Sequence, residues 1–228
     1  EDISIIIPVK DEEVGLNFLL ENFKKSPIDT SYKVNFIFVI DVRTSDSSKV
    51  SASKFSDTII DQMDTIGKGA AVKQAIEYWK NNTTQKVIFL DADGSYSFDS
   101  VIKVLEELER GADVVSGSRF LSNYRRPKGM SRLHNLGNRV LSKISSIRNR
   151  REITDLCTGL WGFSESALKS LEIKSNGFDL EAEIAGLVRR NRLSHIEVNV
   201  DWSQRKGGIS KLRSFTDGLI IFARIIMT

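Results

Sequence analysis

The sequence predicts an α/β fold, with a mostly parallel central sheet that is covered by helices on both faces. Two observations support this prediction. Through the first half of the chain, short runs of apolar and β-branched residues alternate with longer segments of helical periodicity. The 228 residues contain no linker rich in Pro or Gly and no internal repeat. We therefore expect one domain that spans residues 1–228.

The predicted elements follow one another regularly from the N-terminus. The run "ISIIIPV" is the first strand and is expected to end at Pro8, and a helical pattern follows it. Gly111 is expected to end the helix that follows the fourth strand. The predicted strands cover residues 3–9, 33–40, 57–61, 86–90 and 113–117, and the predicted helices cover residues 14–25, 47–55, 70–80 and 98–111.

The composition is that of an ordinary soluble domain, with 40% hydrophobic and 28% charged residues. The single cysteine, Cys157, excludes an intrachain disulfide and favours a reducing compartment. The only histidines are His134 and His195, so the sequence supports neither a structural zinc site nor a Ser-His-Asp or Cys-His catalytic set. No apolar run reaches the length of a membrane-spanning helix.

The net charge of +3 hides a strongly basic segment. Residues 119–151 contain ten Lys or Arg and no Asp or Glu, which gives +10 and leaves −7 for the rest of the chain. Such a segment suits an anionic partner, such as phosphate or acidic lipid, or forms a solvated basic helix face. No aromatic stacking set or nucleic-acid-binding motif accompanies it, so we expect no nucleic-acid partner.

The C-terminal residues, about 212–228, form an apolar stretch that contains Arg224. Two interpretations are open for this stretch: an amphipathic helix at a membrane interface, or a helix packed on the core. Together with the basic segment, the first interpretation predicts peripheral attachment to the cytoplasmic face of a membrane. Whether an anchoring segment follows Thr228 is open, and the sequence does not predict an oligomeric state.

Two carboxylates directly follow the buried run in "VIFLDADGSYS". Asp91 and Asp93 are two residues apart in an extended segment, so their side chains lie on one side of the chain. Two adjacent carboxylates repel, and one takes up a proton unless a cation lies between them. Mg²⁺ is commonly held by one or two carboxylates together with substrate phosphates. Since ligands of such sheets bind beyond the carboxyl ends of the strands, the pattern predicts Mg²⁺ or Mn²⁺ bound with a diphosphate.

Further motifs allow both a functional and a purely structural interpretation. "RKGGISK" combines a glycine pair with three cations, which suits contact with an anion or a solvated basic turn. "GKGAA" opens a helix and either contacts phosphate, with Lys68 as its cation, or is only a turn. Glu181 either serves the site or favours a helix N-terminus, and Asp155 either serves the site or caps a helix.

With these segments assembled, the chain resembles family 2 glycosyltransferases of the GT-A fold, which is Rossmann-like. Within that family it is most similar to the polyprenyl- and dolichyl-phosphate sugar synthases. The resemblance covers nearly the whole chain. Eight segments carry it in order: "SIIIPVKDEE", "VIDVRTSD", "GKGAAVKQAI", "VIFLDADGSYS", "SGSRF", "ITDLCTGLWGFS", "GFDLEAEI" and "RKGGISKL".

The resemblance implies a role for each matching residue. It assigns metal binding to Asp91 and Asp93, of which the second usually holds the ion, and acceptor-phosphate binding to Arg119 and Arg132. The nucleotide-sugar would contact Pro8, Glu12, Asp41, Lys68, Asp91 and Ser210. The catalytic set would be Asp93, Asp155, Glu181, Arg205 and Lys211, of which Arg205 and Lys211 belong to a loop over the donor diphosphate.

The sequence also departs from the family pattern in ways that affect the donor. Val42 and Arg43 replace the usual Asp-Gly after Asp41, so the base is left open. Ser95 replaces the Gln of the mannosyl enzymes, and "DADGSY" is more similar to glucosyl-type relatives. We therefore favour a UDP-sugar donor, with GDP-mannose as the alternative.

The predicted function is metal-dependent, inverting transfer of a hexose from a nucleotide-diphosphate sugar to polyprenyl or dolichyl phosphate at a membrane surface. A lipid phosphate is already ionised and needs no strong base, whereas a hydroxyl acceptor would require Asp155 or Glu181 to take its proton. The alternatives are a hydroxyl acceptor and a non-catalytic nucleotide-sugar-binding module. A sugar nucleotidylyltransferase would require a glycine-rich, Arg-containing loop after the first strand, which "IPVKDEE" does not provide.

Overall fold

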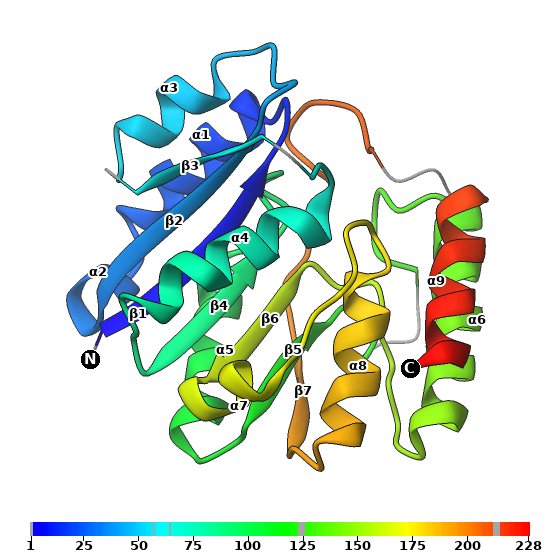
Figure 1. The fold of residues 1–228 in the computed structure, drawn as a ribbon. Coiled ribbons are helices and arrows are strands. Elements are labelled where there is room, and N and C mark those ends of the chain that lie inside the picture. The colour runs from blue at the N-terminus through cyan, green and yellow to red at the C-terminus, as the bar shows by residue number, and fades with distance from the viewer. Residues whose placement is uncertain (1, 57, 64, 123–125, 212–214) are drawn as a thin grey trace.

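The chain is built around a seven-stranded sheet, as Figure 1 shows. The computed structural model describes residues 2–56, 58–63, 65–122, 126–211 and 215–228. The strands are β1 (Asp2–Val9), β2 (Lys33–Asp41), β3 (Ile59–Gln62), β4 (Lys86–Leu90), β5 (Val114–Ser118), β6 (Leu160–Ser164) and β7 (His195–Asn199). Their order is β3-β2-β1-β4-β6-β5-β7, and among the named strands only β6 runs antiparallel to its neighbours.

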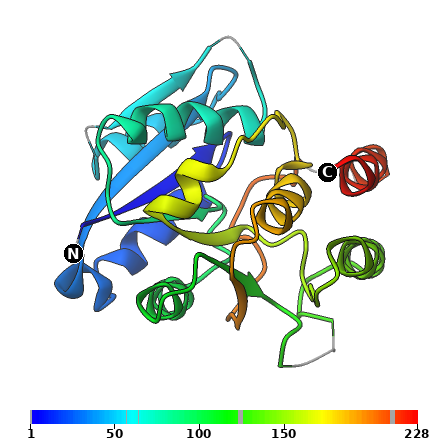
Figure 2. The same cartoon turned by 60° about the horizontal axis from the view of Figure 1, so that its bottom comes forward.

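Helices cover both faces of this sheet, which confirms the predicted α/β class. The helices are α1 (Glu13–Phe23), α2 (Ile28–Ser31), α3 (Ser48–Ser53), α4 (Lys68–Lys80), α5 (Phe98–Glu109), α6 (Arg132–Asn149), α7 (Glu165–Ser170), α8 (Leu180–Arg190) and α9 (Thr216–Met227). One face carries α1, α3 and α5, and the other carries α4, α7 and α8 (Figures 1 and 2). Helices α6 and α9 lie side by side beyond α8.

The core follows from this layering. On the α1/α5 face, the buried side chains include Leu16, Leu20 and Leu105, and on the α4/α8 face they include Trp79 and Phe163. Fully burying a side chain of this size contributes about 1.5–3 kcal/mol. Both sheet faces are therefore well packed, and the rim at the carboxyl ends of β1, β2 and β4 is fixed in place.

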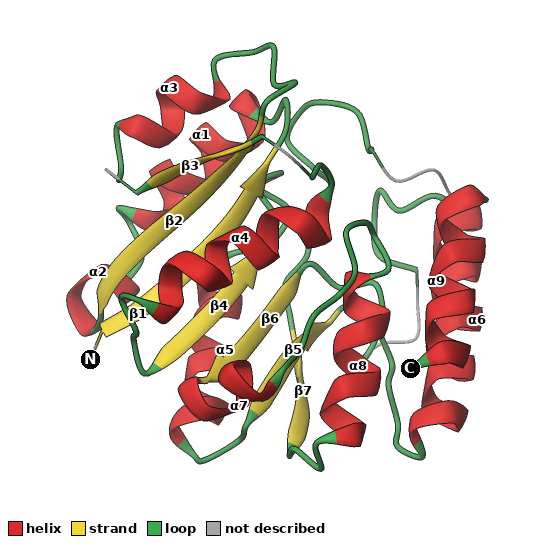
Figure 3. Ribbon diagram, viewed as in Figure 1, coloured by secondary structure: helices red, strands yellow, loops and turns green. Residues whose placement is uncertain are grey.

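The predicted elements in the first half correspond to β1 to β5 and to α1, α3, α4 and α5, with small differences at their ends (Figure 3). β1 continues through Pro8 to Val9 in register with β2. The sheet tolerates this proline because β4 pairs with β1 only as far as Ile6. At Pro8, β1 is therefore paired with β2 alone. α4 begins at Lys68, two residues before the predicted start. Residue 57, the predicted start of the third strand, lies outside the described residues.

The second half contains elements that the periodicity does not predict. β6 follows β5 in the chain but lies between β4 and β5, antiparallel to both. β7 then pairs with β5 in parallel and completes the sheet. Each of these strands has five residues. Residues 132–149 of the basic segment form α6, and its residues 123–125 lie outside the described residues.

The C-terminal helix α9 packs on the protein along one side, as the second interpretation of the apolar stretch predicts. Ile221 and Ile225 pack against Leu156 and Ala185 in a small cluster that joins α6, α8 and α9. Arg224 fixes the helix to the start of α8, with Nε 2.7 Å from an Asp179 oxygen. Other apolar side chains stay exposed on α6 and α9 or just before α9: Leu133, Leu136, Val140, Ile147, Phe215, Leu219, Ile220, Phe222, Ile226 and Met227.

The helices of the described chain include none that is both long and apolar enough to cross a membrane. Residues 212–214, the start of the predicted interface segment, lie outside the described residues. The structure therefore accounts for the C-terminal stretch from Phe215 onward as one helix with a packed stripe and an exposed apolar remainder.

Candidate active site

A cavity of about 570 Å³ opens at the carboxyl ends of β1, β2 and β4 and extends towards Arg119, after β5, and Ile221 of α9. This is the position where ligands bind in such sheets. Eleven of the residues predicted for the site line it: Pro8, Glu12, Asp41, Lys68, Asp91, Asp93, Arg119, Glu181, Arg205, Ser210 and Lys211. Asp155 and Arg132 do not line it, because Asp155 is fully buried behind Arg119 and Arg132 is exposed at the first residue of α6.

Lys68 forms the centre of a buried ionic cluster at the end of β4. Its Nζ lies 2.7 Å from Asp91 Oδ1 and 2.7 Å from Glu181 Oε1. Burial alone would lower the pKa of Lys68, but the two carboxylates outweigh it and raise that pKa. Burial raises the pKa of Glu181, although Lys68 opposes this. Gly159 permits the close packing of Asp91, since a Cβ there would lie 1.9 Å from Asp91 Oδ2.

The N-terminus of α4 is not open to an anion. The backbone N–H of Gly69 donates to Gly177 O at 3.2 Å, and that of Ala70 donates to Asn176 O at 3.1 Å. These groups would otherwise be the free donors of the first helical turn. The "GKGAA" segment is therefore a helix start packed on a neighbouring loop, and it contributes Gly67, Lys68 and Ala71 to the cavity lining.

A second ionic cluster joins the "RKGGISK" loop to the turn after β1. Arg205 pairs with Glu12 and lies 3.9 Å from Asp93 Oδ2, and Lys211 Nζ lies 3.6 Å from Glu12 Oε1. Burial raises the pKa of Glu12, although Arg205 and Lys211 oppose it. Gly208 adopts φ +65°, a left-handed conformation that favours glycine, and this lets the backbone approach Asp11 and Glu12.

Backbone hydrogen bonds hold the same loop against the "DADGSY" turn. The Ser203 N–H donates to Ser95 O at 2.9 Å, and the Lys206 N–H donates to Asp93 O at 3.0 Å. Tyr96 and Trp202 form an isolated β-bridge, and both line the cavity. The loop that carries Arg205 and Lys211 is thus fixed directly to the acidic turn that carries Asp93.

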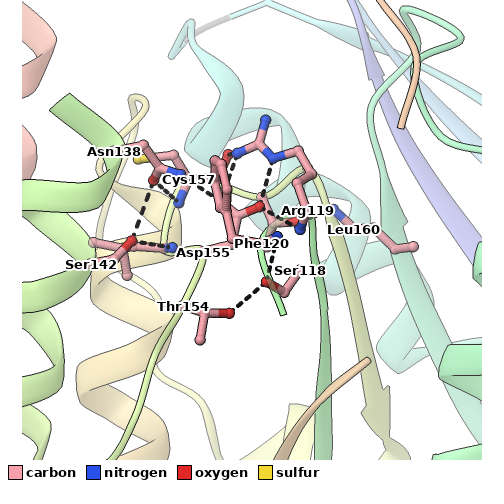
Figure 4. A network of polar contacts seen from close by, with 12 residues as sticks. Ser118, Arg119, Phe120, Asn138, Ser142, Thr154, Asp155, Cys157 and Leu160 are labelled. Carbon is pink, nitrogen blue, oxygen red and sulfur yellow. Dashed lines mark hydrogen bonds and ion pairs between the residues drawn. The ribbon is translucent and has the colours of Figure 1, made fainter. Parts of the chain in front are cut away.

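Arg119 and Asp155 form a buried pair, which Figure 4 shows with its surroundings. Arg119 Nε lies 2.6 Å from Asp155 Oδ2, Nη2 lies 2.7 Å from Oδ1, and the Arg119 backbone N–H also donates to Oδ2. Asn138 Nδ2 donates to Oδ1 at 2.7 Å. Although burial opposes it, the charge of Asp155 raises the pKa of Arg119. Both Asp155 oxygens are therefore occupied by donors from Arg119 and Asn138.

Asp41 lies at the opposite end of the cavity, and the side chain of Arg43 folds back onto it. Arg43 Nε lies 2.9 Å from Asp41 Oδ1, and Nη2 lies 2.5 Å from Oδ2. Hydrogen bonding from Arg43 lowers the pKa of Asp41 below its ordinary value. Gln62 of β3 is in register with Asp41 and also lines the cavity.

The residues at the acidic turn fit a divalent cation. Burial, and then the neighbouring charge of Asp91, raises the pKa of Asp93, and the charge of Arg205, 3.9 Å from Asp93 Oδ2, only partly opposes this. Glu12 Oε2 is buried and has no hydrogen-bond partner. Within the described residues, no group of three or more His, Cys, Asp or Glu side chains could hold a metal ion. Asp93 would therefore hold the ion only together with ligand oxygens, as Mg²⁺ sites with few protein ligands do.

Several residues that line or support the site escaped the sequence analysis. The sequence marks Arg43 only as a departure from the family pattern. Trp202 has no sequence signal for the site, because its position depends on pairing with Tyr96 far away in the chain. The residues without an assigned role were Gln62, Tyr96, His134, Asn138 and Gly159.

The fold and the cavity define a class: an α/β domain in which acidic turns after the strands and the side chains of Lys68, Arg205 and Lys211 line one cavity. Residues 4–172 match the model of "Glycosyl transferase family 2", which covers most of the chain. The chain therefore belongs to glycosyltransferase family 2.

Individual similarities agree with this family. The chain is 28% identical over 190 residues to glycosyltransferase AglJ of Haloferax volcanii, covering 83% of this chain and 61% of the relative. It is 24% identical over 226 residues to dolichol-phosphate mannosyltransferase of Pyrococcus furiosus, covering 94% and 60%. The crystal structure of glucosyl-3-phosphoglycerate synthase from Mycobacterium tuberculosis, in complex with phosphoglyceric acid, has the same fold, with a TM-score of 0.75 at 17% identity over 99% of this chain and 79% of that chain.

The chain spans between 51% and 61% of the length of the first curated relatives that it matches. The remaining part of each of these relatives lies outside the matched segment.

Proposed function

We propose that this chain is the catalytic domain of a metal-dependent, inverting glycosyltransferase. It moves a sugar from a nucleotide-diphosphate donor, with a UDP-sugar favoured over GDP-mannose, to polyprenyl or dolichyl phosphate at a membrane surface. The observation that carries the proposal is the state of Asp155. This carboxylate is held by Arg119 and Asn138 and is fully buried, so it is not available to take a proton from a hydroxyl acceptor.

The donor would occupy the cavity across the ends of β2, β1 and β4. Asp41 and Arg43 lie at one end of it, and Asp93 and Arg205 lie near its middle. A divalent cation held by Asp93, with Asp91 beside it, would neutralise charge on the diphosphate. Arg205 and Lys211 face the same region, and their present partner Glu12 would share them with the diphosphate.

The transfer itself requires little proton chemistry. An ionised oxygen of the acceptor phosphate forms a bond to the anomeric carbon, and the bond from that carbon to the donor diphosphate breaks. The electron pair of the broken bond leaves with the nucleoside diphosphate, so attack from the opposite side inverts the anomeric configuration. The protein's part is to position both phosphates and to stabilise the charge that develops on the leaving group.

The acceptor phosphate would bind beside Arg119. This guanidinium lines the cavity, and Asp155 holds its orientation through two side-chain hydrogen bonds. Arg132 is further out, exposed at the start of α6, and would meet an acceptor only near the mouth of the cavity. The name of the Pyrococcus relative, which specifies dolichol phosphate, supports the same class of acceptor.

The exposed face of α6 and α9 supports attachment to a membrane on its cytoplasmic side. The exposed apolar residues of both helices lie next to the basic segment, and Ile221 of α9 also lines the cavity. Anionic lipid would attract the basic side chains by about 1 kcal/mol for each one close to the surface. A lipid acceptor could then reach Arg119 from the membrane without leaving it.

The test is a transfer assay with labelled UDP-glucose and GDP-mannose and two acceptors, a polyprenyl phosphate and the matching polyprenol. We expect metal-dependent transfer to the phosphate alone, with an inverted anomeric centre in the product. Asp93→Ala should abolish it, whereas Asp99→Ala, an exposed carboxylate on α5, should retain it. Equal transfer to the polyprenol, or no transfer to the phosphate from either donor, contradicts the proposal.

One observation favours transfer to a hydroxyl acceptor as the second candidate. Glu181 lines the cavity, and burial raises its pKa, which suits a general base better than an ordinary carboxylate. Its oxygen is nevertheless 2.7 Å from Lys68 and would have to exchange that partner for the acceptor. Transfer to polyprenol that is lost in Glu181→Gln, but kept in the exposed control Glu77→Gln, would favour this candidate.

A further inference from the structure

We propose that Glu197 of β7 is a positioning residue for the transfer reaction, which fixes the turn before Asp155 and thereby orients the Arg119 guanidinium. Among the described residues, Glu197 is not one of those that line the cavity, so it acts through the Arg119–Asp155 pair. The inference rests on the proposed function, because Arg119 is the residue assigned there to the acceptor phosphate.

Both carboxylate oxygens of Glu197 accept hydrogen bonds from the turn that carries Asp155. Thr154 N lies 3.0 Å from Glu197 Oε1 and 2.9 Å from Oε2, and Asp155 N lies 3.3 Å from Oε1. The Thr154 hydroxyl also donates to Oε2, at 2.7 Å. Glu197 therefore ties this turn to a strand that lies 42 positions further along the chain.

The same carboxylate also reaches the backbone on the other side of the ion pair. Since the Thr154 hydroxyl donates to Glu197, it accepts from the Ser118 hydroxyl, whose oxygen is 2.5 Å away. Ser118 Oγ in turn accepts from the Phe120 N–H at 3.2 Å (Figure 4). Because Ser118 and Phe120 flank Arg119, this chain of hydrogen bonds holds the backbone around Arg119.

The contacts require a side chain with several acceptor sites. The turn presents three donors to Glu197, namely two backbone N–H groups and one hydroxyl. Buried backbone N–H groups need partners, and a carboxylate accepts about four hydrogen bonds. Burial raises the pKa of Glu197, and the hydrogen bonds from Thr154 and Asp155 oppose this rise. A buried carboxylate lowers stability unless donors satisfy it, and here the turn supplies those donors.

The orientation of Arg119 matters because few of its donors remain for a ligand. Its side chain is only 6% exposed. Nε donates to Asp155, and Nη2 donates to both Asp155 and Cys157 O. Of the guanidinium N–H groups, the two on Nη1 are therefore left for an acceptor phosphate. A shift of the turn moves Nη1, and a misplacement of about 1 Å can lower a rate about a hundredfold.

The experiment compares Glu197→Ala with Asp113→Ala in the transfer assay. Asp113 is a matched control, because it accepts from the Ser194 N–H at 2.8 Å and from the Ser194 hydroxyl at 2.9 Å. These contacts hold a turn at the amino ends of β5 and β7, away from the cavity. We expect Glu197→Ala to raise the KM for polyprenyl phosphate at least about tenfold, with a nucleotide affinity within about twofold of the wild type. Asp113→Ala should leave both values unchanged.

Two milder variants keep the test decisive. Glu197→Gln retains one acceptor oxygen and should keep the acceptor KM within about threefold of the wild type. Thr154→Val breaks the link to Ser118 but keeps the backbone N–H groups, so it serves even if Glu197→Ala does not fold. It should raise the acceptor KM at least about threefold. An unchanged acceptor KM in Glu197→Ala or Thr154→Val, an equal rise in Asp113→Ala, or a Gln variant as impaired as the Ala variant overturns the inference.

A measurement that does not depend on transfer separates this inference from the proposed function. The Nε–H of Arg119 is followed by NMR in protein labelled with ¹⁵N-arginine, and Arg119→Lys assigns its signal. Its exchange with solvent should be at least about tenfold faster in Glu197→Ala and Thr154→Val than in the wild type and in Asp113→Ala. Equal exchange in all of these proteins overturns positioning by Glu197 alone. If the wild type transfers no sugar to polyprenyl phosphate, it is the proposed function that fails.

Discussion

The ammonium of Lys68 lies 2.7 Å from a carboxylate oxygen of Asp91, the first aspartate of the "DAD" turn. The protein therefore supplies its own cation to that aspartate, and Glu181 completes the cluster from the other side. This leaves Asp93 as the aspartate of the turn that lacks a strong cationic partner. The metal and the donor diphosphate are then expected to act mainly through Asp93.

Replacing Lys68 by Met is predicted to destabilise the protein strongly. Asp91 and Glu181 would lose their shared cation, and breaking a buried ion pair in this way costs about 3–5 kcal/mol. The free energy of unfolding, from urea titration, measures the effect. Lys80→Met on the same helix removes an exposed lysine and should cost under about 1 kcal/mol. Similar losses in the free energy of unfolding for both variants would contradict a stabilising role of the buried cluster.

Asp93→Asn is predicted to stabilise the ligand-free protein while it removes metal-dependent nucleotide binding. Because the pKa of Asp93 is raised in the folded state, the folded protein binds this proton more tightly than the unfolded chain does. Ionising Asp93 in the folded protein therefore lowers the free energy of unfolding. This free energy falls as the pH rises from 3.8 through the raised pKa of Asp93. Relieving such a cost typically gives about 0.5–2 kcal/mol at neutral pH.

Thermal unfolding at neutral and at mildly acidic pH checks the Asp93→Asn prediction. The stability gain should shrink as the pH falls towards the ordinary Asp range, since the wild-type side chain is then protonated as well. A lower melting temperature for Asp93→Asn at neutral pH would contradict the electrostatic explanation. Asp99→Asn, at an exposed position, is the matched control.

Metal-dependent nucleotide binding is predicted to weaken on acidification at a pH above the ordinary Asp value of 3.8. Asp93 must lose its proton to bind the cation, and burial raises its pKa, as it does for the neighbouring Glu12. Below that raised pKa, one linked proton lowers the affinity about tenfold per pH unit. Titrations across pH with and without EDTA separate this effect from the titration of the nucleotide. A pH-independent affinity down to 4 would contradict it.

Asp155→Asn is predicted to impair use of the acceptor more than binding of the donor. The change leaves Arg119 buried without its counter-ion, so it lowers stability, by about 3–5 kcal/mol, and loosens the guanidinium. The acceptor KM should rise, while the affinity for the nucleotide and the shape of the pH profile of kcat should not change. A general base would behave differently, with a lower kcat, a constant acceptor KM and an altered pH profile.

The first half of the fold was predictable because its strands are continuous apolar runs and its helices have clear periodicity. The strand β6 was not predictable in this way. The chain reverses direction to place its five residues between β4 and β5, antiparallel to both. Similarly, the sequence located Asp91, Asp93 and Glu12 at one rim, since strand ends of a parallel sheet meet there. It could not show that Lys68 pairs with Asp91 and Glu181, which come from distant segments.

The contribution of Asp155 illustrates the limit of assigning roles from motifs. Its position in "ITDLCTG" indicates a site residue, but only the geometry shows that Arg119 and Asn138 occupy its oxygens. The residue therefore belongs to the site as a partner of Arg119. The sequence carries no sign of this, since the two residues are 36 positions apart and the pairing depends on how the turn after β5 packs.

The exposed apolar residues of α9 are predicted to bind lipid surfaces. Leu219 and Phe222 are 56% and 43% exposed, and no described residue covers them fully. The double change Leu219→Ser and Phe222→Ser removes apolar area that a membrane would cover. At about 25 cal/mol per Å² this should weaken binding to vesicles of anionic phospholipid about tenfold or more. Sedimentation with vesicles measures it, and added salt should weaken the remaining attraction of the basic segment.

The control is the double change Val50→Ser and Met63→Ser. It alters two exposed apolar residues, one on α3 and one just after β3, and should leave vesicle binding intact. Because both pairs are exposed, neither should unfold the chain. Equal vesicle binding by both double variants and the wild type would therefore exclude α9 as the membrane contact, and the basic segment alone would remain to explain any attachment.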